Sequence, residues 1–371
     1  MHKEVKMKRS KHGNYHKVVA FVLIAIVIIS AVGFVANGWQ PILDSEADND
    51  DAVNNSGEIT DSGGDNADDV PVVAPPKFYS YLTGLETTEE AEKTIATAFL
   101  TDPELPLYGA SSASLTIEFP IEGGKTRLLV YSECATSLGK IGPIMPTRDY
   151  ISEYLLHFKA TLLSSGNDDV IEYPSKEFKG GLIDISAISG YHYTEGDSAF
   201  TNADLLRAAL RTGGIDTGLE GQVRLPFSFV DVGSSNLEFD NPASEITIPQ
   251  GSSGTTSLVL NGESGRYLYQ KNGSAKTDML NASEIAFDNV FVLFMDSVTY
   301  ETSKGTELVL ATTGSGNGYY ATAGTYTAIK WVCDGDTLTL YDEQDNKLLV
   351  NRGTSYFALV KSTEQRLVTF S

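Results

Sequence analysis

The hydrophobic pattern of the chain begins with one long apolar run. From Val18 to Ala36 every residue is apolar except Ser30. A helix of this length spans roughly 28 Å at about 1.5 Å per residue, which matches the hydrocarbon core of a bilayer. A cleaved signal peptide is the alternative, because a small-residue site is present at Ala31-Val32-Gly33, but its apolar region would be shorter, at about 7–15 residues. We therefore predict a single transmembrane helix over residues 18–36, through which the protein contacts the membrane.

The charges on either side of this run predict its orientation. Residues 1–17 carry six basic side chains and one acidic side chain, and the next basic residue is Lys77. Because basic segments stay on the cytoplasmic side, we expect a cytoplasmic tail over residues 1–17 and extracytoplasmic domains after residue 36. The expected location is thus the cell membrane, crossed once. No cysteine lies directly after the run, so a lipoprotein anchor is excluded.

The pattern then turns polar and acidic. Residues 37–76 include ten acidic side chains and no basic one between Asp44 and Asp69. Such a composition buries too little apolar surface to offset the entropy of ordering, so we predict a disordered linker. The tail contributes +5 and the linker −10 to the total of −22, which leaves −17 on residues 77–371. This charge repels nucleic acid, and we expect no nucleic-acid partner.

Alternating apolar stretches indicate a folded head of two domains. Residues 113–121 and 126–132 read as strands, and the loop between them contains Gly123 and Gly124, so we predict an antiparallel hairpin with a positive φ at one glycine. We expect residues 140–146, with Gly142 and Pro143, to form an irregular surface loop. Thr147 is the predicted cap of a helix over residues 148–158, with a strand over 160–163 and a second helix from about 202 to 213.

The second half of the head reads as a series of short strands separated by turns. This pattern is typical of an all-β sandwich or barrel-like sheet. The predicted fold class is therefore α+β, with a mixed α/β sheet domain over residues 77–222 and a mostly β domain over residues 223–371. The strands are expected at residues 227–230, 245–248, 256–260, 266–270, 290–294, 307–310, 318–321, 325–331, 337–341, 347–351 and 356–360.

Two motifs carry a resemblance to a known family. The run EGGKTRLLVYSE, followed by KIGPIMPTRDY, is similar to the signature of the YerB-like family of bacterial envelope proteins, which shows EGGITR and then KIGPVRSAR. The stretch YLTGL at residues 81–85 also resembles the opening motif of that family. The resemblance implies two domains of unknown function. It also favours a strand over residues 93–100, preceded by a short helical turn, where residues 89–99 alone are equally compatible with helix.

This chain departs from the family pattern at polar positions. Ser114 stands where the family has an acid, Met145 where it has an Arg, and Thr201 where it has a His. Arg148 matches a second family Arg. Asn202 matches the Asn of a further family motif, so the resemblance makes it a candidate ligand-binding residue. If these polar positions form a site in the family, part of that site is missing here.

Four charged residues are the main candidates for chemistry. Arg127 and Arg148 are candidates to hold a phosphate or carboxylate together, since Arg148 is expected at a helix start. The alternative is an ion pair from Arg127 to Glu118 across the hairpin, with another acid on Arg148. Glu118 and Glu122 form a candidate carboxylate pair for acid–base catalysis or Mg²⁺ binding. The alternative is that both are ordinary solvated charges of a loop.

The remaining composition leaves the activity open. Cys134 and Cys333 are the two cysteines, and a disulfide between them or two thiols are both compatible with their spacing. No zinc-binding cluster or nucleotide-binding motif is present, so we expect no metal and no cofactor. We predict a binding or scaffold module of the bacterial envelope, whose partner is an envelope polymer or a membrane protein. The alternative is a metal-assisted hydrolase or transferase acting on a phosphorylated envelope precursor.

Overall fold

The computed structural model describes the head of the chain, with short gaps. The described residues are 75–166, 182–185, 190–219, 223–250, 254–302, 305–335 and 337–371. The predicted transmembrane helix, cytoplasmic tail and most of the linker lie outside these residues. Within them, no helix has both the length and the apolar character that a membrane crossing requires. The protein described below is thus the head, which forms one compact unit over residues 78–371.

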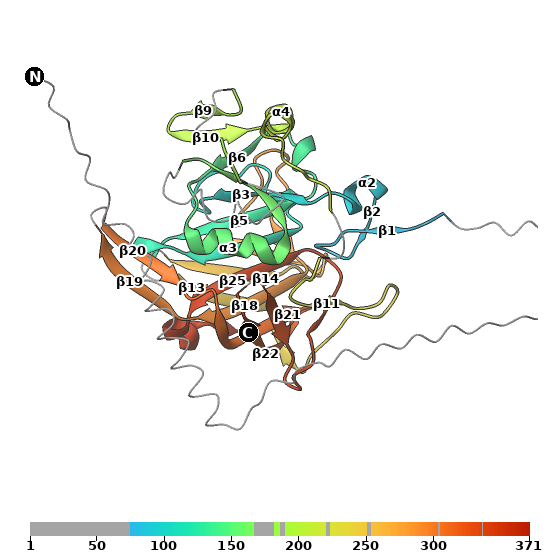
Figure 1. Cartoon of the computed structure of the whole chain (residues 1–371). Coiled ribbons are helices and arrows are strands. Elements are labelled where there is room, and N and C mark those ends of the chain that lie inside the picture. Colours follow the sequence, from blue (N-terminus) through green and yellow to red (C-terminus); the bar gives the residue numbers. More distant parts are fainter. Residues whose placement is uncertain are drawn as a thin grey trace, which may run out of the picture. The chain divides into compact units, whose positions relative to one another are not determined.

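A mixed central sheet runs through the whole head (Figure 1). Its strands pair parallel at four junctions, β18–β25, β25–β4, β3–β7 and β7–β8, and antiparallel at the others. The order is β12 (Asn241–Pro242), β22 (Thr325–Cys333), β21 (Gly314–Thr322), β18 (Asn289–Met295), β25 (Ser355–Lys361), β4 (Leu115–Pro120), β5 (Thr126–Ser132), β3 (Ala96–Thr101), β7 (Ala160–Ser164) and β8 (Leu182–Asp184), with β23 (Leu338–Tyr341) beside β22.

The junction of β25 with β4 joins the two halves of the head. These strands pair in parallel from Ser355 opposite Leu115 to Ala358 opposite Glu118. Strand β25 comes from the end of the chain, and β4 lies in the first half of the head. Both predicted domains therefore contribute strands to one continuous sheet, and the protein is mostly β with few helices.

One face of this sheet packs on a helix and on edge strands. Helix α3 (Asp149–Phe158) buries Ile151, Tyr154 and Leu155 against Phe119 and Tyr131 of the hairpin. The aromatic ring of Phe119 meets that of Tyr154 edge to face, with centroids 5.2 Å apart. The strands β11 (Ser228–Phe229) and β24 (Leu349–Val350) pair in parallel. The buried Val350 belongs to the core on this face, and the partly buried Phe229 packs against it.

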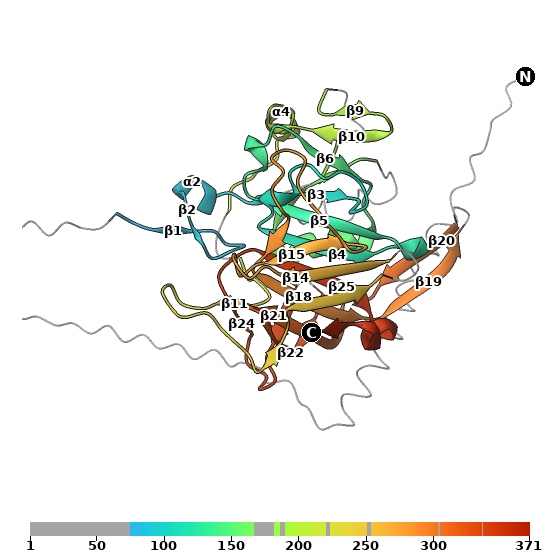
Figure 2. The same ribbon diagram turned by 180° about the vertical axis from the view of Figure 1, so that it is seen from behind.

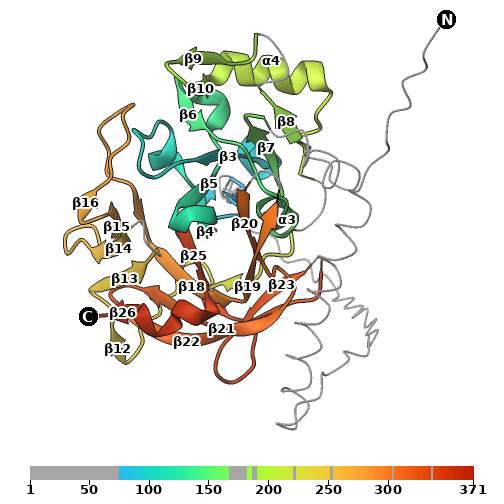
Figure 3. The ribbon, with the colours of Figure 1, turned by 90° about the vertical axis from the view of Figure 1, so that its left-hand side faces the viewer.

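The opposite face is covered by a second sheet and a small subdomain. The second sheet consists of β16 (Ser274–Ala275), β15 (Tyr267–Lys271), β14 (Thr255–Leu260), β13 (Glu245–Pro249) and β26 (Thr369–Phe370), with β17 (Ala286–Phe287) beside β15. Strands β14 and β15 lie in front of β4 and β25 in Figure 2. The subdomain contains β6 (Ile141–Ile144), β9 (Tyr193–Glu195), β10 (Ser198–Thr201) and α4 (Ala203–Gly213), which Figure 3 shows together at one end.

The remaining elements are short and lie at the edges. Strands β1 (Phe78–Tyr79) and β2 (Glu86–Thr87) pair with each other and precede α2 (Glu89–Glu92). Strands β19 (Ser297–Thr302) and β20 (Gly305–Leu310) form a separate hairpin. The 3₁₀ turns are η1 (Ala110–Ser112), η2 (Glu122–Gly124), η3 (Ala135–Ser137) and η6 (Ser362–Leu367).

Most predicted elements are confirmed. The hairpin pairs antiparallel as expected, with Gly123 at φ +73° and Gly124 at φ +70°. Both helices form, and each strand predicted in the second half overlaps an observed strand. The short helix α2 precedes β3, which begins at Ala96, so the strand reading of this region is also confirmed.

Two local predictions are wrong. Gly142 and Pro143 lie in the buried strand β6 and not in a surface loop. Pro143 is tolerated there because the register with β10 shifts between Thr201 and Ala199, so the missing N–H removes no regular ladder bond. Thr147 does not cap α3, because its hydroxyl bonds to Ser152 and Arg148 holds the cap position.

We expect the Gly123→Val substitution to lower the free energy of unfolding by about 1–3 kcal/mol, because a branched side chain is strained at positive φ. A Cβ at Gly123 would contact nothing within 4 Å, so the penalty is conformational and not steric. Gly139 is the matched control, since it is equally open but lacks a positive φ. Urea denaturation of both Val variants measures the difference, and equal losses would contradict the explanation.

Candidate functional site

Glu118, one of the predicted site residues, lies at the centre of a buried hydrogen-bond network. Glu118 is fully buried on β4. The Oε1 atom accepts hydrogen bonds from Thr126 Oγ1 at 2.6 Å, Thr256 Oγ1 at 3.1 Å and Lys271 Nζ at 2.9 Å. One carboxylate oxygen thus receives an ion pair and two hydroxyl donors inside the protein.

The second oxygen of Glu118 is equally occupied. Oε2 accepts from the hydroxyls of Tyr269, at 3.2 Å, and Tyr356. Burial, followed by the negative charge of Glu118, raises the pKa of both phenols well above 10. The two tyrosines therefore keep their protons and serve as permanent donors to the carboxylate.

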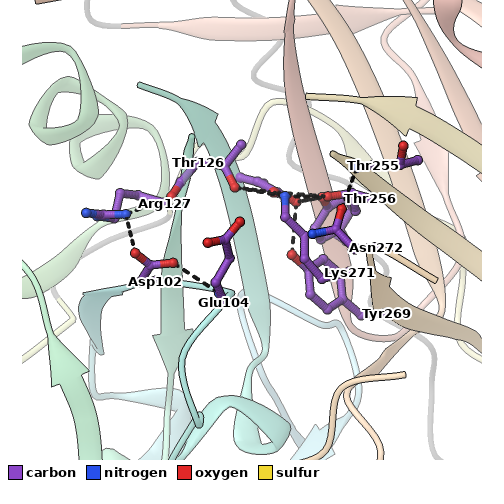
Figure 4. Close-up of polar contacts among 11 residues, drawn as sticks. Asp102, Glu104, Thr126, Arg127, Thr255, Thr256, Tyr269, Lys271 and Asn272 are labelled. Carbon is purple, nitrogen blue, oxygen red and sulfur yellow. Dashed lines mark hydrogen bonds and ion pairs between the residues drawn. The ribbon is translucent and has the colours of Figure 1, made fainter. Parts of the chain in front are cut away.

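Lys271 completes the network from β15. Its side chain is 3% exposed, and Nζ donates to Glu118 Oε1, to Thr126 Oγ1 at 3.1 Å and to Thr256 Oγ1 at 3.1 Å. Figure 4 shows Lys271 between Thr126 on one side and Thr256 on the other. Because an ammonium group has three N–H donors, its hydrogen-bonding capacity is fully used.

This geometry gives the network a structural role. Glu118 and Thr126 belong to the first half of the head, while Thr256, Lys271 and the two tyrosines belong to the second. A carboxylate whose partners are all protein groups, and which solvent does not reach, is not placed to take a proton from a substrate. The network is a buried polar clamp between β4 and the second sheet.

Arg127 points to the other side of the central sheet. It pairs with Phe119 across the hairpin, so Arg127 and Phe119 share a face and Glu118 points away from both. The expected alternative of an Arg127–Glu118 ion pair is therefore wrong. Arg127 instead bonds Asp102 Oδ2 at 2.8 Å, as Figure 4 shows, in a pair with side chains 16% and 14% exposed.

Arg148 meets the hairpin turn from the start of α3. Its guanidinium donates to Glu122 and, at 3.1 Å, to the carbonyl of Thr147. Burial opposes ionisation of Glu122, but the hydrogen bond and charge of Arg148, with a contribution from Arg127, lower the pKa of this carboxyl. Burial, followed by the charge of Glu122, raises the pKa of the Tyr150 hydroxyl, and the charges of Arg148 and Arg127 oppose this rise. The structure thus brings Arg127, Arg148 and Glu122 to one corner and places Glu118 elsewhere.

The remaining candidates have local structural roles. Asn202 caps α4, since its side chain accepts from the N–H of Leu205 at 3.0 Å. Cys134 and Cys333 form no disulfide, and Cys333 is buried with its sulfur 3.7 Å from Nε2 of His157. Across the described residues, no group of three or more His, Cys, Asp or Glu side chains is arranged to hold a metal.

A cleft that no sequence pattern predicted lies beside the YLTGL motif. Its volume is about 580 Å³. Arg352 lines it near two aromatic rings, with the guanidinium carbon 5.3 Å from the ring centre of Tyr79 and 6.0 Å from that of Phe229. The lining residues are Tyr79, Ser80, Tyr81, Gly84, Glu92, Lys93, Leu219, Val223, Phe229, Val232 and Arg352.

Neither Lys271 nor Arg352 was predicted as a site residue from the sequence, for different reasons. The strand predicted here ends at residue 270 and omits Lys271, yet Lys271 continues the alternation of Tyr267 and Tyr269, whose side chains face the core. A lysine at the next inward position of an alternating strand signals a buried ionic partner. Arg352 carries no such signal, because its neighbours in space are distant in the sequence.

Comparisons with known proteins identify the family. The model of the N-terminal domain of a protein of unknown function, DUF3048, matches residues 82–214. The model of the C-terminal domain of the same family matches residues 246–357. The chain belongs to this family, and the resemblance stated from its motifs is confirmed.

A solved structure of similar fold is the crystal structure of the YerB protein from Bacillus subtilis. The TM-score is 0.67 at 16% identity, and the match covers 80% of this chain and 100% of the YerB chain. At this identity the likeness concerns the fold alone. No curated protein matches the chain in sequence.

We expect Lys271→Met to lower the free energy of unfolding by about 3–5 kcal/mol, because it leaves a buried carboxylate without its counter-charge. Adding Glu118→Gln should recover part of this loss, which a double-mutant cycle in urea measures. The control is Lys330→Met, which removes an exposed ion pair with Asp345 and should cost about 0–1 kcal/mol. A Lys271→Met loss no larger than this control would contradict the clamp.

The lowered pKa of Glu122 predicts an acid-dependent contribution to stability. A carboxyl with a lower pKa in the folded state stabilises above its unfolded pKa, near 4.5, and the contribution is lost as pH falls through the lowered folded pKa. Arg148→Gln should therefore destabilise the protein at pH 7 and progressively less below pH 4.5. Unfolding free energies across this range measure the effect. In a Glu122→Gln background the Arg148→Gln effect should no longer depend on pH in this range.

Proposed function

We propose that this protein is a non-catalytic binding module of the bacterial cell envelope. The observation that carries the proposal is a difference between the four charged residues predicted from the sequence and the arginine in the cleft. Arg127, Arg148, Glu118 and Glu122 are each engaged by an oppositely charged protein group. The cleft, by contrast, presents Arg352 with aromatic neighbours and has room for a ligand, since pockets for small molecules typically measure about 300–1,000 Å³.

The location in the envelope rests on the sequence. The apolar run over residues 18–36 would hold the protein in the cell membrane, and the basic tail would keep residues 1–17 in the cytoplasm. The acidic linker would then separate the head from the bilayer on the outer side. A head in this position would meet an envelope polymer or a membrane protein, which are the partners that we propose.

The second candidate function is metal-assisted hydrolysis or transfer on a phosphorylated envelope precursor. The corner formed by Arg127, Arg148 and Glu122 favours it, because two guanidinium groups near one another are suited to an anionic phosphate. Two observations weigh against it. Both arginines already bind carboxylates, and Glu118, the other proposed metal ligand, points to the opposite face of the sheet.

Full-length protein in detergent, incubated with phosphorylated envelope precursors and Mg²⁺, distinguishes the two functions. We expect no turnover above that of a protein-free control. Turnover that Arg127→Ala abolishes, while the exposed Lys330→Gln variant retains it, would overturn the binding proposal. In parallel, the protein should sediment with isolated envelope polymer or cross-link to a membrane protein. Failure of both would also contradict the proposal.

A further inference from the structure

Arg352 is held in the cleft by the backbone of two distant segments. Its Nε donates to the carbonyl of Val230 at 2.9 Å, and Nη1 donates to the carbonyl of Gly84. The aromatic faces of Tyr79 and Phe229 both lie close to the guanidinium group. These contacts fix the position of the cation beside two aromatic rings, where an electrostatic interaction is stronger than in open solvent.

The YLTGL motif shapes this seat. Gly84 has φ +67°, and a Cβ there would approach the ring of Phe229 to 2.9 Å. The neighbouring Thr83 carbonyl accepts from the N–H of Gly353 at 2.8 Å, directly after Arg352. The motif therefore needs glycine both for its backbone conformation and for the close approach of Phe229. Its effect is to align the Gly84 carbonyl with Arg352.

The charge of Arg352 has no internal counterpart in the described parts of the head. Within them, no carboxylate lies within 4 Å of its guanidinium, although residues 77–371 carry a net charge of −17. Glu92, which also lines the cleft, accepts from the backbone N–H of Tyr79. A guanidinium has five N–H donors, and the two carbonyls engage one each. The remaining donors suit a planar acceptor with two oxygens.

We propose that the cleft binds the C-terminal carboxylate of a peptide that ends in an apolar or aromatic residue. The carboxylate would bind Arg352, and the side chain would pack on Phe229 and Val232. A single uncompensated cation matches a monoanion better than a phosphate dianion, which the negative head repels. Capture of a terminal carboxylate is an established mode of peptide recognition. This inference rests on the proposed binding function and names its ligand class.

The test compares three small probes on full-length protein in detergent. N-acetylphenylalanine carries the carboxylate, N-acetylphenylalaninamide lacks the charge, and phenyl phosphate replaces it with a dianion. Calorimetry should show binding of the acid at least about tenfold tighter than that of the amide, and no tighter binding of the phosphate. Equal affinity for acid and amide, or preference for the phosphate, would overturn the ligand class.

Variants at the cleft rim locate the site without disturbing the seat of Arg352. Val232 is 58% exposed, so its replacement leaves the core intact. Val232→Glu should supply an internal carboxylate to Arg352 and reduce binding of the acid at least about tenfold. Val232→Gln, which removes the apolar contact without adding charge, should reduce binding less. Leu367→Glu, at a position 55% exposed and outside the cleft, controls for added charge. Unchanged binding in Val232→Glu would overturn the proposal.

These outcomes separate the ligand from the function. If the protein still associates with envelope material but does not distinguish acid from amide, the carboxylate proposal fails and the binding function stands. If precursor turnover depends on Arg127, the binding function itself fails. Loss of acid binding in Val232→Glu together with loss of envelope association would connect the cleft to the partner.

Discussion

The architecture of the head depends on a buried charge pair between Glu118 and Lys271. Removing two charges from water costs several kcal/mol each, so the pair is tolerable only where every remaining donor and acceptor is engaged. Here the four surrounding hydroxyls, from Thr126, Thr256, Tyr269 and Tyr356, provide that engagement. A different packing of the second sheet on β4 would place apolar residues opposite these groups and leave them without hydrogen bonds. The network therefore specifies one arrangement of the two. The network contributes more to the choice of one packing over others than to the free energy of unfolding.

This clamp explains why residues that suggested chemistry turned out to be structural. A charged pair in a sheet looks the same in sequence whether it binds substrate or another strand. What decides is the face on which each side chain lies, and the pairing of Arg127 with Phe119 separates Arg127 from Glu118 by the thickness of the sheet. The arginines then find acids from other segments, Asp102 and Glu122. In a head with so many acids, an arginine without a carboxylate is the more informative feature.

The sequence was a good guide to local structure and a poor guide to contacts between distant segments. Glycines and apolar alternation are read within a few positions, so the hairpin at Gly123 and the helix that begins near residue 202 were predictable. The strand at Gly142 and Pro143 was not, because proline is normally excluded and only the irregular pairing with β10 admits it. The partners of Glu118 lie 138 to 238 residues away in the second half, and no local pattern specifies them.

The position of β25 has a consequence for folding during synthesis. This strand is made near the end of the protein, yet it lies between β18 and β4 in the middle of the sheet. About 240 residues separate β4 from β25, which takes on the order of 10–50 s at a synthesis rate of 5–20 residues per second. Throughout that interval one edge of β4 lacks its neighbour and is open to pairing with other chains. This edge is therefore exposed to aggregation during synthesis. A product that stops before residue 355 lacks the strand that joins its two halves.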